Sequence, residues 1–166
     1  AIYLIILLCS FSAESRWVNI DDASAEYNFN NIDITVNKDG TSEAIHEIKL
    51  KILNEQGRNN YASFNLMYNE HTSKVNIISA YTIYQNKKYH VDLKTIEDKT
   101  LASSNAGFDD IRQIIISFPK AEIGTELYIK YSKIENKTML PNFYNDILSF
   151  GYGGCWNNIQ ININSK

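Results

Sequence analysis

Cys155 is the residue whose type and neighbours come closest to those of a covalent catalyst. It lies in the segment Tyr152-Gly153-Gly154-Cys155-Trp156, where small residues would let a helix begin at the thiol and stabilise its thiolate. Residues 157–164 instead alternate as a strand does, and every histidine of the chain precedes the cysteine, which leaves no downstream base. The sequence therefore favours a half-buried free cysteine beside a core tryptophan, and we predict no catalytic residue.

The three histidines also give no metal-site pattern. His46 shares a strand face with apolar residues, which is typical of a hydrogen-bonded core histidine rather than a ligand. His71 and His90 are isolated in or near polar turns, and no His, Cys or Asp spacing matches a metal site. We therefore predict no metal and no cofactor.

The acidic residues are candidates for ion pairs before they are candidates for cation ligands. Asp109 and Asp110 are adjacent, so in a strand they would point to opposite faces. We expect one ion pair with Arg112, or a turn at the strand's entrance. Asp92, Glu97 and Asp98 form a solvated acidic group, with a cation site as the alternative.

Tyrosines supply the most visible candidate binding surface. A platform for a sugar ring could be formed by Tyr81, Tyr84, Tyr89 and Tyr128, although aromatic residues at period two more often pack across strands. A second possible interaction surface is the outward face of one strand, which carries Glu126, Tyr128 and Lys130.

The chain has 166 residues, enough for one domain with a proper core. Its net charge is -3 with both signs interspersed, which argues against a nucleic-acid partner. Residues 14–166 are predicted to form a single domain with no internal linker.

Residues 1–13, AIYLIILLCSFSA, are apolar but shorter than the roughly 20 residues that span a bilayer. They fit the apolar region of a signal peptide truncated at its start, with an uncleaved membrane anchor as the alternative. Leu8 stands where lipidation of Cys9 would need a small residue. We therefore expect export to the periplasm or cell envelope, with membrane contact through this segment alone.

Two strands are predicted at the centre of the fold. Arg112–Phe118 contains three consecutive isoleucines, a run typical of a strand buried on both faces. Thr125–Tyr131 alternates apolar and polar residues. Pro119 and Gly124 lie between them, so we expect the two strands to form a hairpin.

The remaining chain also shows period-two patterns. Asp39-Gly40 joins Ile32–Val36 to Thr41–Leu53 in a hairpin, and Asn86 supplies the left-handed residue in the turn after Val75–Tyr84. Residues 14–31 are expected to be a polar lead-in with at most one helical turn. Asn54-Glu55-Gln56-Gly57 is expected to end the preceding strand with a turn. Further strands are expected within Tyr61–Tyr68, Tyr89–Asp92, residues 93–101, Ile147–Phe150 and Trp156–Asn164. The predicted fold class is all-β, a two-layer antiparallel β-sandwich of about nine or ten strands with little helix.

The order of several short motifs resembles one known family. They are Asp39-Gly40, His46, Ile52-Leu53-Asn54-Glu55-Gln56-Gly57, Tyr61-Ala62, Val75, Ala80, Ile83, Asp109-Asp110-Ile111-Arg112, Phe118-Pro119, Gly124-Thr125, Leu127 and Tyr131. From Glu26 to Tyr131 the chain resembles the bacterial domain of unknown function 3857, which precedes a transglutaminase-like cysteine-peptidase domain in exported proteins. Asn86 departs from the family, which usually carries glycine in that turn.

The resemblance implies a non-catalytic β-sandwich that packs on, positions or restricts access to a neighbouring catalytic domain. That domain, with its Cys–His–Asp set, would begin after Lys166, and no catalytic residue carries over to this chain. The segment around Cys155 itself resembles the transglutaminase nucleophile motif, without the histidine. The alternative function is a stand-alone glycan- or peptide-binding sandwich that uses its tyrosine-rich face.

Overall fold

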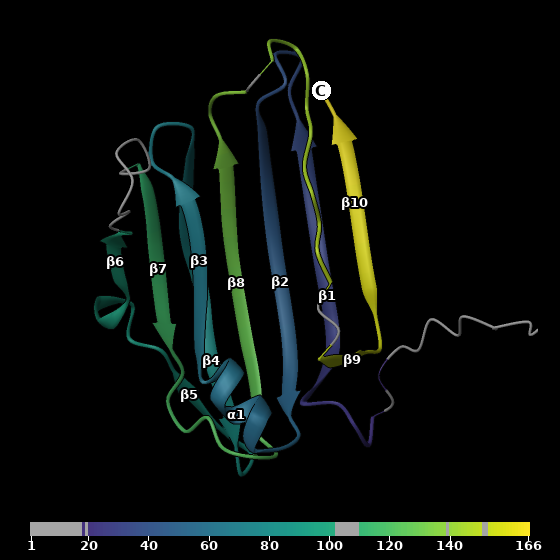
Figure 1. The fold of residues 1–166 in the computed structure, drawn as a ribbon, viewed down its shortest axis with the longest axis vertical. Coiled ribbons are helices and arrows are strands. Elements are labelled where there is room, and N and C mark those ends of the chain that lie inside the picture. The colour runs from purple at the N-terminus through teal and green to yellow at the C-terminus, as the bar shows by residue number, and fades with distance from the viewer. Residues whose placement is uncertain (1–17, 19, 102–109, 139, 151–152) are drawn as a thin grey trace, which may run out of the picture.

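The structure is a computed structural model that describes the whole chain except residues 1–17, 19, 102–109, 139 and 151–152. The predicted signal segment and the loop expected at 102–107 lie outside the described residues. The described part is a two-layer β-sandwich with little helix (Figure 1), so the predicted fold class is confirmed. No helix in this described part is long and apolar enough to cross a membrane.

The described residues form ten strands, one short α-helix and one 3-10 turn. In chain order these are β1 Ala25–Val36, β2 Ser42–Ile52, α1 Glu55–Tyr61, β3 Ser63–Asn69, β4 Ser73–Tyr84, β5 Lys87–His90, η1 Leu93–Thr95, β6 Glu97–Thr100, β7 Ile111–Ser117, β8 Glu126–Glu135, β9 Gly154–Trp156 and β10 Ile159–Ser165.

The strands are divided between a large and a small sheet. The large sheet has the order β10-β1-β2-β8-β4-β5, with β9 also pairing with β1 (Figure 1). The small sheet has the order β3-β7-β6. Most pairs are antiparallel, as predicted, but β9 and β10 run parallel to β1.

The β1–β2 hairpin is confirmed, and its turn chemistry explains it. Gly40 has a φ of 86°, a left-handed conformation that costs a glycine little. The Asp39 carboxylate accepts hydrogen bonds from the Thr41 backbone N–H at 3.0 Å and from the Thr41 hydroxyl at 2.7 Å. The turn into β5 is also confirmed, since both Gln85 and Asn86 have positive φ.

The predicted hairpin between the two central strands is wrong. β7 and β8 lie in different sheets, and each has neighbours on both sides in its own sheet. Their connection crosses between the layers, because the Phe118 N–H donates to the Ala62 carbonyl beside the small sheet while the Gly124 N–H donates to the Ile52 carbonyl of β2. Burial on both faces is also wrong for β7, since Ile115 is only half-buried.

Three smaller predictions are also corrected. β1 begins at Ala25, inside the expected lead-in, because its first residues pair with β9 as well as with β2. Asn54, expected to open a turn, instead caps α1, and its side-chain oxygen accepts from the Gly57 N–H at 2.9 Å. Ile147–Phe150 forms no strand, and the Ile147 side chain is 87% exposed.

The inner face of the large sheet has two different covers. The small sheet covers the first core cluster, in which Ile114, Ile116 and Phe118 pack with Leu127 and Ile129 of β8. We call residues 140–150 the covering segment. It runs without strand structure along β1 (Figure 1) and places Tyr144 and Leu148 on the second core cluster, Ile32, Ile34 and Ala44.

Candidate functional site

The predicted interaction surface lies on the outer face of β8, where all three residues face the same way. Their side chains pair with charged residues of β2, since Tyr128 donates to the Glu47 carboxylate at 2.7 Å. Lys130 Nζ lies 3.4 Å from the same carboxylate, and Lys49 Nζ lies 3.0 Å from Glu126. Burial, together with the bond to Glu47, raises the pKa of the Tyr128 hydroxyl. The surface therefore consists of half-buried polar side chains of β8, each paired with a charged residue of β2.

The four predicted platform tyrosines do not share one face. Tyr81 and Tyr128 stack on the outer face with ring centres 4.4 Å apart, and Lys88 Nζ lies 4.0 Å above the Tyr81 ring. Tyr89 pairs with Thr82, which is fully buried on the inner face, and strand alternation places Tyr84 on that side too. The outer face therefore offers a tyrosine pair whose rings already contact each other.

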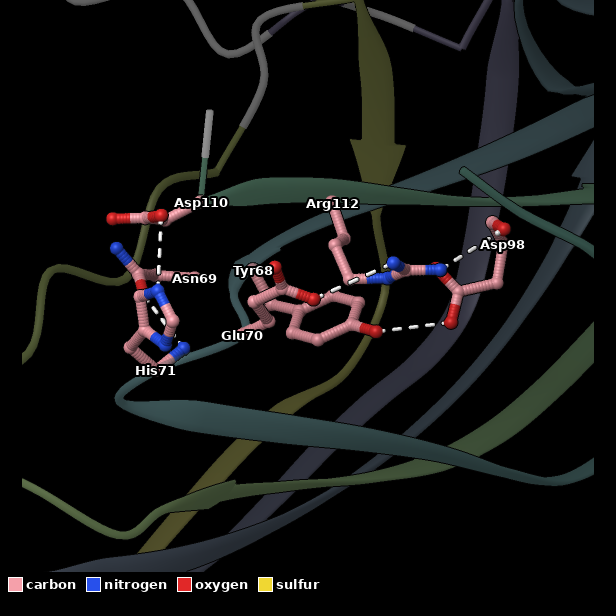
Figure 2. Close-up of polar contacts among 7 residues, drawn as sticks. All are labelled: Tyr68, Asn69, Glu70, His71, Asp98, Asp110 and Arg112. Atoms are coloured by element: carbon pink, nitrogen blue, oxygen red, sulfur yellow. Dashed lines mark hydrogen bonds and ion pairs between the residues drawn. The ribbon is translucent and has the colours of Figure 1, made fainter. Parts of the chain in front are cut away.

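A second polar group lies at the end of the small sheet (Figure 2). The Asp98 carboxylate accepts from Tyr68 at 3.0 Å and from Arg112 Nε at 2.9 Å, and Arg112 Nη1 lies 3.4 Å from Glu70. The hydrogen bond that Arg112 donates to the Asp98 carboxylate raises the pKa of the guanidinium. Arg112 thus joins β6, β7 and the end of β3, which explains its position structurally.

His71 and Asp110 form the other half of the view in Figure 2. His71 Nε2 lies 3.0 Å from Asp110 Oδ1. The Asn69 side-chain oxygen accepts a hydrogen bond from the His71 backbone N–H. Asp110 is a turn residue at the entrance of β7, as expected, but its partner is His71 rather than Arg112. Asp109 lies outside the described residues.

The three predicted acidic residues, Asp92, Glu97 and Asp98, do not form one group, because each has a different partner. Asp92 caps η1 by accepting from the Lys94 N–H, and Glu97 pairs with Lys99 while Asp98 holds Arg112. Among the described residues, no group of three His, Cys, Asp or Glu side chains is arranged to hold a metal ion.

Cys155 lies in β9, paired in parallel with Glu26 of β1, and not at the start of a helix. Its side chain is half-buried, and Sγ lies 4.0 Å from the Asn157 side-chain oxygen. Its neighbour Trp156 stacks on Tyr27, with ring centres 3.7 Å apart and planes 11° apart. The half-buried cysteine is as predicted, whereas the neighbouring tryptophan is half-buried and stacked on Tyr27 rather than part of the core.

A cavity of about 310 Å³ that the sequence patterns did not predict lies on the inner face of the large sheet. Its lining includes Ile48 and Tyr131 of the first core cluster and Ile32 of the second. The cavity is lined by Tyr27, Asn30, Ile32, His46, Ile48, Phe64, Tyr131, Ile147, Leu148, Ser149, Phe150 and Trp156.

His46, predicted to be a core histidine, lies in the wall of this cavity. Its ring stacks on Tyr131 with centres 4.6 Å apart and planes 4° apart. Burial lowers the pKa of His46, nearby Lys133 lowers it further, and Asp146 opposes both. Burial also raises the pKa of Tyr131 to about 12. Both side chains are therefore uncharged at neutral pH.

The two packed sheets and this inward cavity define the class of protein, an all-β sandwich domain. Residues 38–164 match the family described as a domain of unknown function with a solved structure, DUF3857. The chain belongs to this family, so the resemblance drawn from the sequence motifs is confirmed.

Solved structures agree on the fold. A protein from Parabacteroides distasonis, described as a putative protease, is similar with a TM-score of 0.61 and 20% sequence identity. The match covers 68% of this chain and 23% of that protein, so the chain spans about a quarter of its length. No curated protein sequence matches the chain significantly.

Weaker likenesses extend to two other structures. A CBM3a-L domain of a Clostridium thermocellum scaffoldin has a TM-score of 0.36 at 14% identity, with 69% of each chain covered. An M1 zinc metallopeptidase from Deinococcus radiodurans has a TM-score of 0.31 at 9% identity, with 67% of this chain and 21% of that one covered. Neither carries an inference about this chain.

Proposed function

We propose that this domain is a non-catalytic accessory sandwich of an exported protein, acting beside a transglutaminase-like cysteine-peptidase domain. The observation that carries the proposal is family membership over residues 38–164. The Parabacteroides distasonis protein supports it, because its similarity to this chain occupies 23% of a longer chain described as a putative protease. Such a domain would position or shield the catalytic domain.

The outer face of β8 is the surface that we propose for contact with the catalytic domain. Its charged side chains are partnered across β2 and held half-buried, which fixes their positions before any partner arrives. A preordered surface loses less side-chain entropy on binding than a mobile one. Charges of both signs would also set the orientation of a partner.

The test begins with the reading frame that contains this sequence. We expect it to encode a transglutaminase-like Cys–His–Asp set after Lys166. A frame without that set would refute the accessory role.

In the full-length protein, Tyr128→Ala combined with Lys130→Ala should change peptidase or acyl-transfer activity while the domain remains folded. The matched control is Glu97→Ala with Lys99→Ala, an exposed ion pair of the small sheet. Equal activity of both double variants would exclude the β8 face as the contact.

A binding function is the second candidate, and the inner cavity rather than the tyrosine-rich face now favours it. Tyr81 and Tyr128 stack on each other, so the faces between them are not available to a ligand. The cavity has aromatic walls and enough volume for a ligand group. Pockets of a few hundred Å³ with mostly apolar walls are typical ligand sites.

A further inference from the structure

β10 is an edge strand of the large sheet, and among the described residues it pairs with β1 alone (Figure 1). The Asn30 N–H donates to the Asn158 carbonyl, and the Lys166 N–H donates to the Val36 carbonyl. In a parallel ladder, alternate residues direct their N–H and C=O groups to opposite sides of the strand. The residues of β10 whose groups point away from β1 are Ile159, Ile161, Ile163 and Ser165. Such a row of backbone groups is a template for another strand.

β10 lacks the features that usually keep other strands away from a sheet edge, which are short length, charged side chains, proline and bulges. It has seven residues, pairs with β1 in an unbroken register, and contains no charged residue and no proline. The edge strands β5 and β6 have four residues each and carry the charges of Lys87, Lys88, Glu97, Asp98 and Lys99. The edge strand β3 contacts β4 of the large sheet. Strand addition therefore meets the least opposition at β10.

The inner face of β10 continues the apolar row of the second core cluster to the edge of the sheet. Ile161 and Ile163 pair with Ile32 and Ile34, so the four side chains point to the same face. Ile32 and Ile34 are 4% and 1% exposed, whereas Ile161 and Ile163 are 39% and 62% exposed. A strand added beside β10 would bury part of this apolar surface, which favours its addition.

The sequence of β10 is nearly symmetric about Asn162. Ile161 and Ile163 flank this residue, and Gln160 and Asn164 follow on either side. When two copies of β10 pair antiparallel with Asn162 on the two-fold axis, Ile161 lies opposite Ile163 of the second copy. Gln160 then lies opposite Asn164, so isoleucines meet on the inner face and amides meet on the outer face. Matched pairs of this kind, without like charges, stabilise neighbouring strands.

The same register uses every backbone group that β10 directs away from β1. In an antiparallel pair, opposite residues at alternate positions exchange two hydrogen bonds. With Asn162 on the axis, Ile161 exchanges with Ile163 and Ile159 exchanges with Ser165. A register shifted by two residues leaves one of the end residues, Ile159 or Ser165, without a partner in the strand. The backbone and the side chains therefore select the same register.

We propose that β10 is an interface for a second copy of this chain, which adds antiparallel with Asn162 at the two-fold axis. The two large sheets then form one continuous sheet. The dimer is closed, because each copy has one β10 edge and the pairing occupies both. A single strand edge is a small interface, so the dimer forms and dissociates with protein concentration. β1 and β2 lie between β10 and β8, so the outer face of β8 stays accessible.

Single cysteines test the register in the full-length protein, with oxidised glutathione as the oxidant and peptide mass spectrometry to assign each bond. Asn162→Cys should link two copies, because opposite residues of this kind have Cα atoms about 4.5 Å apart, within the range of a disulfide. Gln160→Cys and Asn164→Cys are matched controls at exposed positions of the same strand. Neither should link to itself, and a mixture of the two should link, because each faces the other across the axis.

Sedimentation velocity over a concentration series measures the dimer itself. Ile163→Lys should raise the dissociation constant at least about tenfold, because a lysine on a strand edge opposes strand addition. Ile163 is 62% exposed, so the domain should keep its fold. Met67→Lys is the matched control, since Met67 is a 65% exposed apolar residue of β3, and it should leave the dissociation constant unchanged.

Other occupants of the β10 edge give different results. A strand supplied by later residues of the same reading frame would keep the full-length protein monomeric and block all of these cross-links. Addition of strands in other registers would give self-links of Gln160→Cys or fibres in place of a dimer. Each of these results would overturn the proposal, as would equal weakening by Ile163→Lys and Met67→Lys.

The dimer does not depend on the proposed function. A reading frame without a transglutaminase-like domain would refute the accessory role and leave the pairing of β10 unchanged. Conversely, a monomeric full-length protein would overturn the dimer and leave the accessory role untouched.

Discussion

One sheet supports two unlike cores in this domain. Over the first core cluster, the small sheet places Ile114 and Ile116 against β8, and Ile116 is fully buried. Over the second, the covering segment contributes Tyr144 and Leu148, which are only half-buried. Closed packing and an open cavity therefore share one face of the large sheet. We expect the closed packing to contribute most of the stability.

The largest expected effect comes from the first core cluster. Ile116→Ala should lower the free energy of unfolding by about 2–5 kcal/mol, because it leaves a cavity under the small sheet. Leu148→Ala in the covering segment should cost about half as much or less, since it removes less buried area. Urea denaturation measures both, and equal losses would erase the difference between the two covers.

Substitutions at Gly40 and Gly124 test how tightly the covering segment packs on the β1–β2 turn. Gly40 and Gly124 have φ values of 86° and 84°, so alanine at either position is strained by about 1–2 kcal/mol. A Cβ at Gly40 would also lie 2.7 Å from the Phe143 backbone nitrogen, whereas one at Gly124 meets nothing within 4 Å. Gly40→Ala should therefore be less stable than Gly124→Ala by at least about 1 kcal/mol.

Thermal and urea unfolding of the two glycine variants give that difference directly. If Gly40→Ala and Gly124→Ala unfold alike, the β1–β2 turn does not support the covering segment.

The smallest expected effect is a pH dependence from the cavity wall. Burial lowers the pKa of His46 below its ordinary value of about 6.5, so the unfolded chain takes up the proton more readily. This contribution to stability is complete above about pH 6.5 and is lost as the pH falls from there toward the folded pKa. His46→Phe, which keeps a ring against Tyr131, should flatten that part of the profile.

Urea denaturation at several pH values between 7.5 and 5 measures this slope. His90→Gln is the control, because His90 lies on the outer face beside Tyr81. If the free energy of unfolding depends on pH equally in His46→Phe and in the unchanged protein, His46 is exposed to solvent rather than buried.

Local sequence signals predicted much of the fold. Asp39-Gly40 and Asn86 define their turns through residues that tolerate positive φ, and the alternation of β2 and β8 assigns their inner faces. The β7–β8 connection was beyond such reasoning, because Pro119 and Gly124 fit a hairpin turn and a crossing equally well. The distant carbonyl groups of Ala62 and Ile52 decide between them.

The cavity was beyond local reasoning for the same physical reason. Asn30 stands in a polar stretch that reads as a lead-in, and only its pairing with Ile48 and Ile159 places it on the inner face. Trp156 and the covering segment come from the other end of the chain. Alternation in β8 did predict that Glu126, Tyr128 and Lys130 share a face, but it could not supply their partners on β2.

Native-state hydrogen exchange tests the division of the sheet most directly. Among the described residues, the covering segment makes few backbone hydrogen bonds, such as that from the Asn142 N–H to the Asp39 carbonyl, so it should open at a free energy well below that of global unfolding. The amides of Ile114 and Ile116 in β7 should exchange only with global unfolding. Equal protection of Asn142 and Ile116 would contradict the account and make the two covers a single cooperative core.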